Sequence, residues 1–217
     1  MTRQQQTSSH EWDNPSRTSV PTRELQQDRA LRTRALVLRC AGEVFAERGY
    51  KATSVADIAA RAGVTKGAVY FHFANKEVLA VAVVEEHYTR WPAVLEEVRL
   101  LRLSALDTML ALLDRAAEAF HSDPVVQGGA RLQIEHALIG LPLPVPYVGW
   151  IDLVASLLRE ARDGGQLRPG VVPEAAARAI VTGFFGMQHA SATLHQRADL
   201  IERWQEMRAL FVHAIKA

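Results

Sequence analysis

One short segment limits what this chain can fold into more than any other. It reads "SVADIAARAG" and covers residues 54–63. Ser54 can cap the first turn of a helix, and Asp57 stands three residues on, which is the spacing of a reciprocal helix cap. Gly63 stands where that helix would end, because glycine readily takes the left-handed conformation that closes many helices. The segment therefore predicts a short helix with defined ends.

A second short helix follows in the segment "VTKGAVYFHF". Thr65 can cap it, and we expect it to run from Lys66 to about Phe73. Two short helices joined by a tight glycine turn are typical of a helix-turn-helix.

The remaining chain also carries helical spacing, because apolar residues recur at intervals of three and four. The expected helices cover Asp28 to about Gly49, Lys76 to Trp91 after an Asn75 cap and with a kink at Pro92, and then about 103–120, 124–138, 150–162, 174–194 and 198–215. Three prolines make the segment after Gly140 extended. We find no strand run, repeat or glycine-rich phosphate loop, so we predict an all-α fold.

The N-terminal segment differs from the rest in composition. Residues 1–26 are rich in Gln, Ser, Thr and Arg without an apolar period, which predicts a disordered tail. This segment also lacks the apolar centre of a secretory signal. No apolar run approaches the roughly 18 residues that a membrane helix needs, so we expect no membrane span. The single cysteine, Cys40, excludes an intrachain disulfide, and together these features favour a cytoplasmic protein.

The charges are unevenly distributed along the chain. Residues 1–76 hold 12 Lys/Arg and 7 Asp/Glu, whereas residues 77–217 hold 13 and 17, and the net charge of the whole is +1. A basic first third is typical of a protein with one end that meets a polyanion. An unevenly charged solvated surface gives the same balance, so charge alone leaves both interpretations open.

The second short helix carries groups suited to DNA. A recognition helix lies in the major groove with its N-terminal residues nearest the bases and phosphates. A hydroxyl, two cations, a glycine that lets the backbone approach and two polar-tipped rings are the candidates: Thr65, Lys66, Gly67, Tyr70, His72 and Lys76. We expect Phe71 and Phe73 to pack inward and anchor this short helix. A small aromatic core with incidental cations is the alternative.

An enzyme is the main alternative from another class of protein. The 8 histidines are scattered, and the zinc-protease, nucleophile-elbow and paired-cysteine motifs are absent from the sequence. Glu85, Glu86 and His87 are adjacent, and adjacent residues on a helix do not share a face. We therefore predict no catalytic residue, no metal site and no cofactor.

The C-terminal two thirds contain polar residues among apolar ones. A small-molecule pocket is mostly apolar with a few polar groups, and a ligand can supply the partner that a buried Tyr, Trp or Gln needs. The candidates are Tyr88, Gln133, Tyr147, Trp150, Thr182 and Gln188. Taken singly, each of these is more often an ordinary core or surface residue.

The run "GYKATSVADIAARAGVTKGAVYFHFANKEVLA" resembles the DNA-binding segment of the TetR family of repressors, and the resemblance is specific over about residues 30–80. It implies a three-helix DNA-binding domain, here residues 27–74, and a six-helix ligand-binding and dimerisation domain, here residues 75–217. It also implies that a small molecule releases the DNA. By position, the implied DNA contacts are Ser54, Thr65, Lys66, Gly67, Tyr70, His72 and Lys76, with Arg32 or Arg34 on phosphate.

The resemblance implies that two chains pair through the helices at about 174–194 and 198–215. The first of these is apolar on two faces, and Gly183, Gly186 and Ala190 allow close helix approach. One apolar face can serve the core of one chain and the other a twofold mate. Twofold pairing in turn implies a pseudo-palindromic operator. A helix fully buried within one chain is the alternative.

Four further runs are "AVVEEHYTRWP", "GARLQIE", "LPLPVPYVGW" and "FFGMQHASATLHQRADLIERWQE". They are similar to the receptors for Streptomyces autoregulators, most of all to the methylenomycin furan receptors, which control antibiotic genes. Their signals are γ-butyrolactones, butenolides and 2-alkyl-4-hydroxymethylfuran-3-carboxylic acids. The similarity implies that Tyr88, Gln133 and Tyr147 bond the polar head and that Trp150 packs on its ring. The apolar candidates for the alkyl chain are Val84, Phe120, Leu153, Phe185 and Met187.

The class of signal stays open, because an alkyl chain in an apolar slot discriminates weakly. An acid head would want a cation, for which His87 and Arg90 are candidates. Tyr88 lies on the helix that begins after Asn75, so a ligand there would move this helix and change the separation of the two recognition helices. A regulator of the same fold that answers an antibiotic or its precursor is the alternative.

Overall fold

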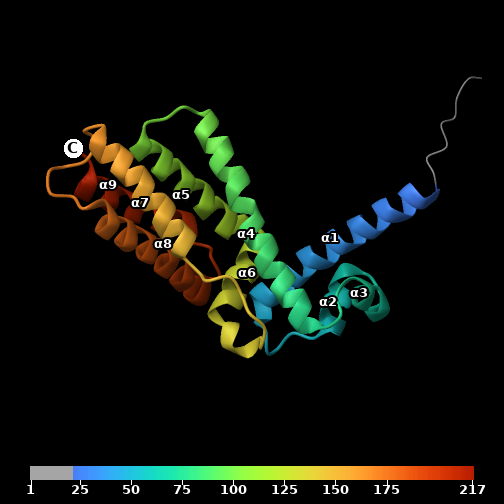
Figure 1. The fold of residues 1–217 in the computed structure, drawn as a ribbon. Helices are drawn as coiled ribbons and strands as arrows, with labels where there is room; N and C mark the ends of the chain where they lie inside the picture. Colours follow the sequence, from blue (N-terminus) through green and yellow to red (C-terminus); the bar gives the residue numbers. More distant parts are fainter. Residues whose placement is uncertain (1–21) are drawn as a thin grey trace, which may run out of the picture. The chain divides into compact units, whose positions relative to one another are not determined.

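In the computed structural model of this chain, the structure describes residues 22–217, with side chains from residue 26 onward (Figure 1). Nearly all of the predicted tail over residues 1–26 lies outside the described residues. The described residues divide into two compact units, residues 22–33 and residues 34–217.

The described residues are almost entirely helical, which confirms the predicted all-α fold. The helices are α1 (Thr22–Arg48), α2 (Val55–Ala62), α3 (Lys66–His72), α4 (Lys76–Leu100), α5 (Ala105–Ser122), α6 (Pro124–Ile134), the 3-10 turn η1 (His136–Leu138), α7 (Val148–Asp163), α8 (Pro173–His195) and α9 (Leu200–Ile215). Over residues 22–217, extended pairing is limited to one antiparallel bridge between Leu167 and Lys216.

The helix ends of the helix-turn-helix follow the local sequence as predicted. Ser54 and Asp57 form a complete capping box at the start of α2. Gly63 closes α2 in the left-handed region, with φ of 64°. The Thr65 hydroxyl then accepts a hydrogen bond from the Ala68 amide at 3.1 Å and caps α3.

Two helices extend beyond their predicted ends. α1 begins at Thr22, ahead of the predicted start at Asp28. α4 continues through Pro92 to Leu100, so the proline does not end it. A helix tolerates a missing N–H when its flanking turns are held by packing, and Val98 near the C-terminal end of α4 is buried.

Two groups of buried apolar residues stabilise the unit formed by residues 34–217. The first joins α1, α2, α3 and the first half of α4, and it includes Phe45 and Ile58. The second joins α5, α7, α8 and α9, and it includes Phe120 and Phe184. Trp91 of α4 packs against this second group, so α4 takes part in both.

α6 packs very closely on two other helices through glycines. A Cβ at Gly128 would lie 2.5 Å from the carbonyl oxygen of Gly42 on α1. A Cβ at Gly129 would lie 2.6 Å from Cβ of His87 on α4. Both distances are too short for a side chain, so the close contacts of α6 with α1 and α4 require these glycines.

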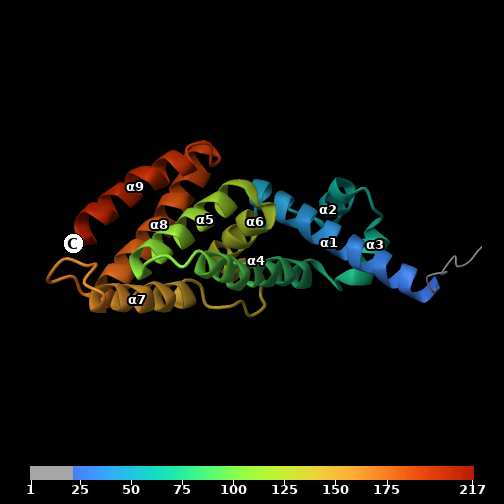
Figure 2. The same cartoon turned by 90° about the horizontal axis from the view of Figure 1, so that it is seen from above.

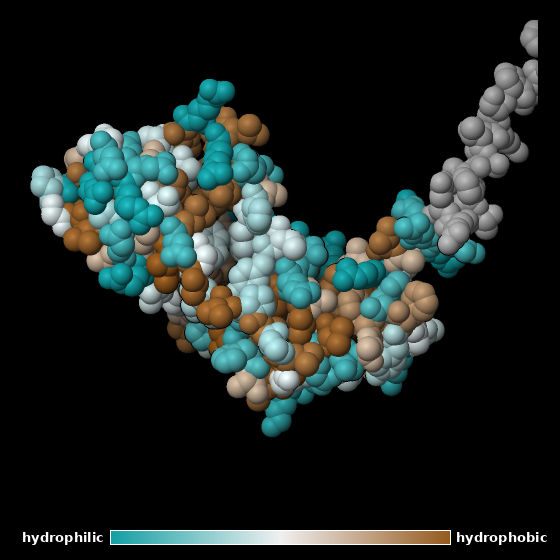
Figure 3. All heavy atoms as spheres, viewed as in Figure 1, coloured by the Kyte–Doolittle hydropathy of each residue, from teal (hydrophilic) through white to brown (hydrophobic). Residues whose placement is uncertain are grey.

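α5 lies at the centre of the larger group of helices, where it contacts α4, α6, α7 and α9. α8 packs against α7 on one side and α9 on the other, and these helices run alongside one another in Figures 1 and 2. Apolar residues also reach the surface on the face drawn in Figure 3. The exposed apolar side chains of the chain include Leu138, Leu141 and Val145, which stand between α6 and α7.

Among the described helices, none is by itself both long and apolar enough to cross a membrane. α3 and α4 meet the length and composition only when they are taken together, as a pair bent by 62°.

Candidate DNA-binding surface and ligand pocket

α3 presents one face to solvent and another to the protein interior. Val69 and Phe73 are 1% and 3% exposed, and they stand four residues apart on the same side of the helix. The guanidinium of Arg34 on α1 lies 5.2 Å from the centre of the Phe73 ring. These contacts fix α3 against α1, as the predicted inward packing of Phe73 requires.

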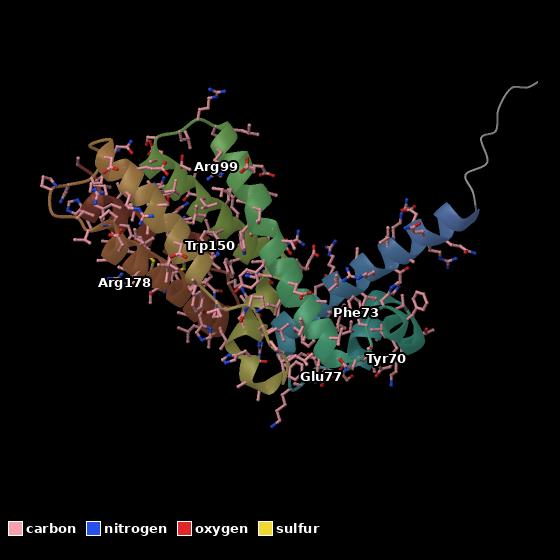
Figure 4. The ribbon with its side chains drawn as sticks, in the orientation of Figure 1. Tyr70, Phe73, Glu77, Arg99, Trp150 and Arg178 are labelled. Atoms are coloured by element: carbon pink, nitrogen blue, oxygen red, sulfur yellow. The ribbon has the colours of Figure 1, made fainter. Side chains whose placement is uncertain are left out.

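The exposed face of α3 gathers four of the predicted DNA contacts. Thr65, Lys66, Gly67 and Tyr70 are all exposed, and Tyr70 stands one turn after Lys66 (Figure 4). A Cβ at Gly67 would find only the Thr65 hydroxyl within 4 Å, at 3.8 Å, so this part of the helix surface is open. His72, half-buried, lies at the end of α3.

Phe71 does not pack inward, so that prediction is wrong. Its side chain is 79% exposed, and its ring contacts the neighbouring His72 ring at 5.0 Å. The reason is the helical period: Phe71 stands two residues from both Val69 and Phe73, which places it on the opposite side of α3. An exposed aromatic side chain therefore joins the solvent face of this helix.

Ser54 is exposed at the start of α2, but its hydroxyl already has partners. It donates to Asp57 Oδ2 at 2.6 Å and accepts from the Asp57 amide at 3.2 Å. Asp57 Oδ1 also accepts from Arg48 at 3.1 Å. Ser54 is thus a helix cap that stands at the surface.

Lys76 is held inside the protein to a greater degree than predicted. Its ammonium donates to the carbonyl oxygens of Tyr50 and Thr53, each at 3.0 Å, and lies 4.1 Å from the centre of the Tyr50 ring. Two of its three donors are thus used to tie α4 to the segment between α1 and α2. The Tyr50 hydroxyl in turn donates to Glu77 at 2.9 Å. The DNA contact predicted at Lys76 stays a prediction, and one of its three N–H donors takes no part in these two bonds.

The two candidate phosphate-binding arginines of α1 have different surroundings. Arg32 belongs to the unit of residues 22–33, where it forms an ion pair with Asp28 at 2.7 Å on the solvent side of the helix. Arg34 is exposed and stacks on Phe73 as described above.

A polar cavity of about 20 Å³ is lined by side chains of α4, α6, α7, α8 and the proline segment. Gln133 is its central group, because its Nε2 donates both to the Tyr88 hydroxyl and to the Pro144 carbonyl oxygen, each at 3.0 Å. Burial raises the pKa of Tyr88, so its hydroxyl remains a protonated donor at neutral pH. The lining residues are His87, Tyr88, Ala130, Gln133, Pro146, Tyr147, Trp150, Phe185 and Gln188.

An apolar groove of about 320 Å³ adjoins this cavity. Tyr88, Tyr147 and Trp150 line both spaces, so the polar cavity and the groove share a wall. Figure 4 labels Trp150 on α7. The groove is lined further by Trp91, Pro92, Leu95, Leu112, Val145, Gly149 and Leu153. The two spaces together have the mostly apolar wall and few polar groups of a small-molecule site.

Tyr147 holds an unusual backbone conformation at this junction. Its φ is 70°, in the left-handed region, directly before α7 begins at Val148. Its ring lies 4.7 Å from that of Phe185. A non-glycine residue in this region stores conformational strain, which is common where a ligand binds.

The structure brings seven of the predicted ligand residues to these spaces and leaves four outside. Tyr88, Gln133, Tyr147, Trp150, Phe185, Gln188 and Leu153 line the cavity or the groove. Val84 is fully buried in the first apolar core, so it does not reach the pocket. Phe120 and Met187 are buried in the second core, and the Phe120 ring lies behind Trp91 and Phe185. Thr182 is exposed on α8, which makes its predicted place in the pocket wrong.

The two candidate cations for an acid head also differ from expectation. His87 lines the polar cavity, but burial lowers its pKa to about 4, so its ring is neutral at physiological pH. Its Nδ1 is buried and has no hydrogen bond among the described residues. Arg90 lies 2.9 Å from Asp123 and does not line the cavity.

Sequence reasoning missed most of the apolar groove and a polar junction between α6 and the end of α1. Arg131 Nη1 donates to the carbonyl oxygens of Ala46 at 2.9 Å and Glu47 at 3.2 Å. Glu135 accepts from the Tyr50 amide at 2.5 Å and from Arg131 Nε at 3.0 Å. A cation at these carbonyls satisfies the end of α1 and favours its helix dipole. No local pattern signals such bonds, because they join residues far apart in sequence.

Both apolar faces predicted for α8 are largely buried within one chain. Ile180, Phe184 and Met187 on one face, and Val181 and Gln188 on the other, are all buried. The exposed residues of α8 include several small ones beside longer ones: Glu174, Ala175, Arg178, Ala179, Thr182, Gly186, His189, Thr193, Leu194 and His195. Leu210 on α9 is 70% exposed.

Among residues 22–217 no group of His, Cys, Asp and Glu is placed to hold a metal ion.

Two family models match this chain. The model for bacterial regulatory proteins of the tetR family matches residues 37–83, and the model for the tetracyclin repressor-like C-terminal domain matches residues 103–216. The second match alone covers more than half of the chain. The protein therefore belongs to the TetR family of transcriptional regulators.

Individual relatives narrow the class further. The A-factor receptor protein of Streptomyces griseus is 32% identical over 192 residues, which cover 87% of this chain and 67% of the relative. A solved structure described as the molecular basis for control of antibiotic production by bacterial hormones is 58% identical, with a TM-score of 0.79 over 86% of this chain and 99% of that one. The structure of CprB from Streptomyces coelicolor with its operator sequence is 30% identical, with a TM-score of 0.78 over 87% and 90%. This chain is a TetR-family transcriptional repressor similar to the autoregulator receptors.

Proposed function

We propose that this protein binds a pseudo-palindromic operator as a dimer and leaves it when a small autoregulator binds. The signal would be a 2-alkyl-4-hydroxymethylfuran-3-carboxylic acid, a butenolide or a γ-butyrolactone, and the controlled genes would serve antibiotic biosynthesis. The observation that carries the proposal is a polar cavity that shares Tyr88, Tyr147 and Trp150 with an apolar groove. Each of these signals joins a polar ring to an alkyl chain. The groove matches the chain, and the ring would enter the cavity of about 20 Å³, which holds about one water, only when the Tyr88–Gln133 contact opens.

The DNA contacts belong to the same proposal, with residues 27–74 as the DNA-binding domain. Thr65, Lys66, Gly67 and Tyr70 on the solvent face of α3 would meet bases and phosphates, because they are exposed and stand at the start of the helix. His72, Arg34, Arg32 and Ser54 would add contacts at its margin. Lys76 would contribute mainly by holding the segment between α1 and α2.

The ligand would lie across both spaces, within a domain formed by residues 75–217. Tyr88, Gln133 and Tyr147 would bond the polar head, with Gln188 and the neutral His87 beside them. Trp150 would pack on the ring, and Leu153 with Trp91 and Leu95 would contact the alkyl chain. Neutral N–H and O–H groups can donate a hydrogen bond to a lactone carbonyl or to a carboxylate, so all three classes of signal suit this lining.

Two helices would couple ligand binding to DNA binding. α4 has Tyr88 in the cavity and Lys76 bonded to the segment before α2. α6 has Gln133 in the same cavity and Arg131 bonded to the end of α1. A ligand that displaced the Tyr88–Gln133 hydrogen bond would thus act on both connections. Release of the DNA requires only that the ligand bind more tightly to the conformation of the dimer in which the two recognition helices cannot reach both half-sites of the operator.

Dimer formation through α8 and α9 is also part of the proposal. The exposed small residues of α8 would let a second helix approach closely, and Leu194 and Leu210 offer exposed apolar contacts nearby. Thr182 would belong to this surface.

A regulator of the same fold that answers an antibiotic or its precursor is the second candidate. The apolar groove suits an antibiotic or its precursor as well as it suits an autoregulator, since an apolar slot accepts many hydrophobic compounds. Catalysis is not proposed, because the polar residues of the cavity lack a nucleophile paired with a base.

Calorimetric titration of the purified protein with each synthetic signal tests ligand binding. We expect saturable binding of one class, at least tenfold weaker in Trp150→Ala, and unchanged in Arg115→Ala, which changes an exposed arginine of α5. Saturable binding that Trp150→Ala leaves unchanged would contradict the assignment of the pocket.

A further inference from the structure

A second cavity, of about 330 Å³, lies where α1, α6 and α8 meet, within the unit of residues 34–217. Its walls include the apolar side chains of Ala46, Ile134 and Ala192 and the polar side chains of Arg131, Glu135 and Arg197. It is separate from the groove of the proposed signal, although Ala130 and Gln188 line both this cavity and the small polar one. The second cavity therefore has both apolar and charged side chains in its lining.

Arg197 is the unusual residue of this cavity. It stands between α8 and α9 with φ of 67°, and its backbone amide donates to the Ser191 carbonyl oxygen at 3.1 Å. Its Nε is buried without a hydrogen bond, and no ion pair between described residues includes its guanidinium. Burial lowers the pKa of Arg197, and the nearby Arg131 lowers it further. Arg197 as a whole is half-buried, so its Nε lies out of water while the rest of the guanidinium faces the cavity or solvent. A buried N–H beside a like charge is costly unless an acceptor reaches it.

The charges of the cavity lining leave one positive charge unbalanced. Arg131 is paired with Glu135 at 3.0 Å, so their charges offset each other. His189 also lines the space, and Arg197 remains as the cation without a carboxylate. A single negative charge beside Arg197 would balance the cavity, and a planar carboxylate matches the fork of a guanidinium.

We propose that this cavity is a second ligand site, which binds a small carboxylic acid with its carboxylate on Arg197 and its hydrocarbon part against Ala46, Ile134 and Ala192. The volume admits an acid of several carbons, and the apolar wall favours one over a bare inorganic anion. Arg131 and Ala46 are bonded to each other across this same cavity. An acid bound there would strengthen the contact between α6 and α1 and so change DNA affinity.

The proposal is tested by calorimetric titration of the full-length protein with hexanoate, with 1-hexanol and with inorganic phosphate. We expect saturable binding of hexanoate at one site per chain and none of the alcohol or of phosphate. Arg197→Gln should weaken hexanoate binding by roughly tenfold or more, since a charge-assisted pair is lost. Ala192→Leu, which narrows the cavity and keeps the cation, should weaken it as well. Arg99→Gln, which removes an exposed guanidinium near the C-terminal end of α4 (Figure 4), should leave it unchanged.

Several results would overturn the proposal. The absence of saturable hexanoate binding to the wild type would do so, as would full binding to a folded Arg197→Gln protein. Loss of hexanoate binding in Trp150→Ala would place the acid in the autoregulator pocket instead. If Arg197→Gln turned a dimer into monomers on size-exclusion chromatography with light scattering, the guanidinium would be paired with a carboxylate of a second copy. The autoregulator proposal is judged separately, by the Trp150→Ala titration with the signals.

Discussion

The side-chain amide of Gln133 on α6 donates a hydrogen bond of 3.0 Å to the hydroxyl of Tyr88 on α4, inside the polar cavity. Both helices also bond to the part of the chain that leads from α1 to α2: Lys76 of α4 bonds to the Tyr50 carbonyl oxygen, and Arg131 of α6 bonds to the Ala46 carbonyl oxygen. This bond is therefore placed where the head of a ligand would compete with a contact between the two connecting helices.

Gln133→Ala and Tyr88→Phe should each leave operator affinity within about threefold of the wild type, because neither residue is exposed on α3. Each should weaken ligand-dependent release by roughly tenfold, the loss of one or two buried hydrogen bonds. Titration of signal into the protein–DNA complex measures both quantities. Loss of DNA binding in either well-folded variant would contradict the separation of the two sites.

Lys66→Ala should weaken DNA binding and reduce the slope of log affinity against log salt concentration by about one unit, as the loss of one phosphate contact does. Binding measured at several salt concentrations gives this slope. Lys216→Ala is the matched control, because Lys216 is an exposed lysine near the end of α9. An unchanged slope in Lys66→Ala would show that its ammonium does not meet a phosphate.

Phe71 and Phe73 form a matched pair of aromatic residues at the C-terminal end of α3, where Phe73 follows the last helical residue. Phe73→Ala should lower the free energy of unfolding by about 3–5 kcal/mol, because it empties a buried site. Phe71→Ala should change it by no more than about 0.5 kcal/mol, since the ring is 79% exposed. Urea unfolding measures both, and equal losses would contradict the described orientation of α3.

Gly129→Ala should destabilise the protein by about 1–3 kcal/mol, because the new Cβ would lie 2.6 Å from His87 Cβ. Gly149→Ala on α7 is the control, since a Cβ there meets nothing within 4 Å and alanine favours a helix. Thermal unfolding should separate the two variants. A stable Gly129→Ala protein would mean that α6 and α4 can move apart without cost.

His87 makes stability depend on pH in a defined window. Its pKa is lowered from 6.5 to about 4 in the folded protein, mainly by burial, so the unfolded chain binds the proton more readily between those values. Stability should therefore fall as pH drops from about 6.5 towards 4, by up to about 3 kcal/mol from this residue. Urea unfolding at pH 6.5 and pH 4.5 tests this. His87→Phe, which cannot take up a proton, should lose that part of the pH dependence, and an identical dependence in the variant would refute the assignment.

The local signals of the sequence predicted much of the fold. Ser54, Gly63 and Thr65 set helix ends through bonds to their own neighbours, so their effect is legible from spacing alone. Gln133, Tyr147 and Trp150 reach one cavity as expected from the resemblance of the runs around them. In these cases the decisive contacts are local, or they follow a pattern shared with the family.

The errors have a common physical cause. Phe71 and Val84 are apolar residues on helices, and hydropathy alone does not say which side of the helix meets which neighbour. Thr182 looked like a pocket residue because it stands among buried ones, yet its own side of α8 is exposed. Arg131 and Arg197 were not predicted, since their surroundings come from segments distant in sequence. Burial and long-range bonds require the packed structure.

The central claim is that a ligand in the pocket between α4 and α6 releases DNA held by α3. Fluorescence anisotropy of the full-length protein on labelled DNA from its own promoter region tests this most directly, with furan, butenolide and γ-butyrolactone signals titrated in parallel. We predict tight binding that one class of signal reverses in the wild type and reverses far less in Gln133→Ala. Tight binding that none of the signals reverses would contradict the account.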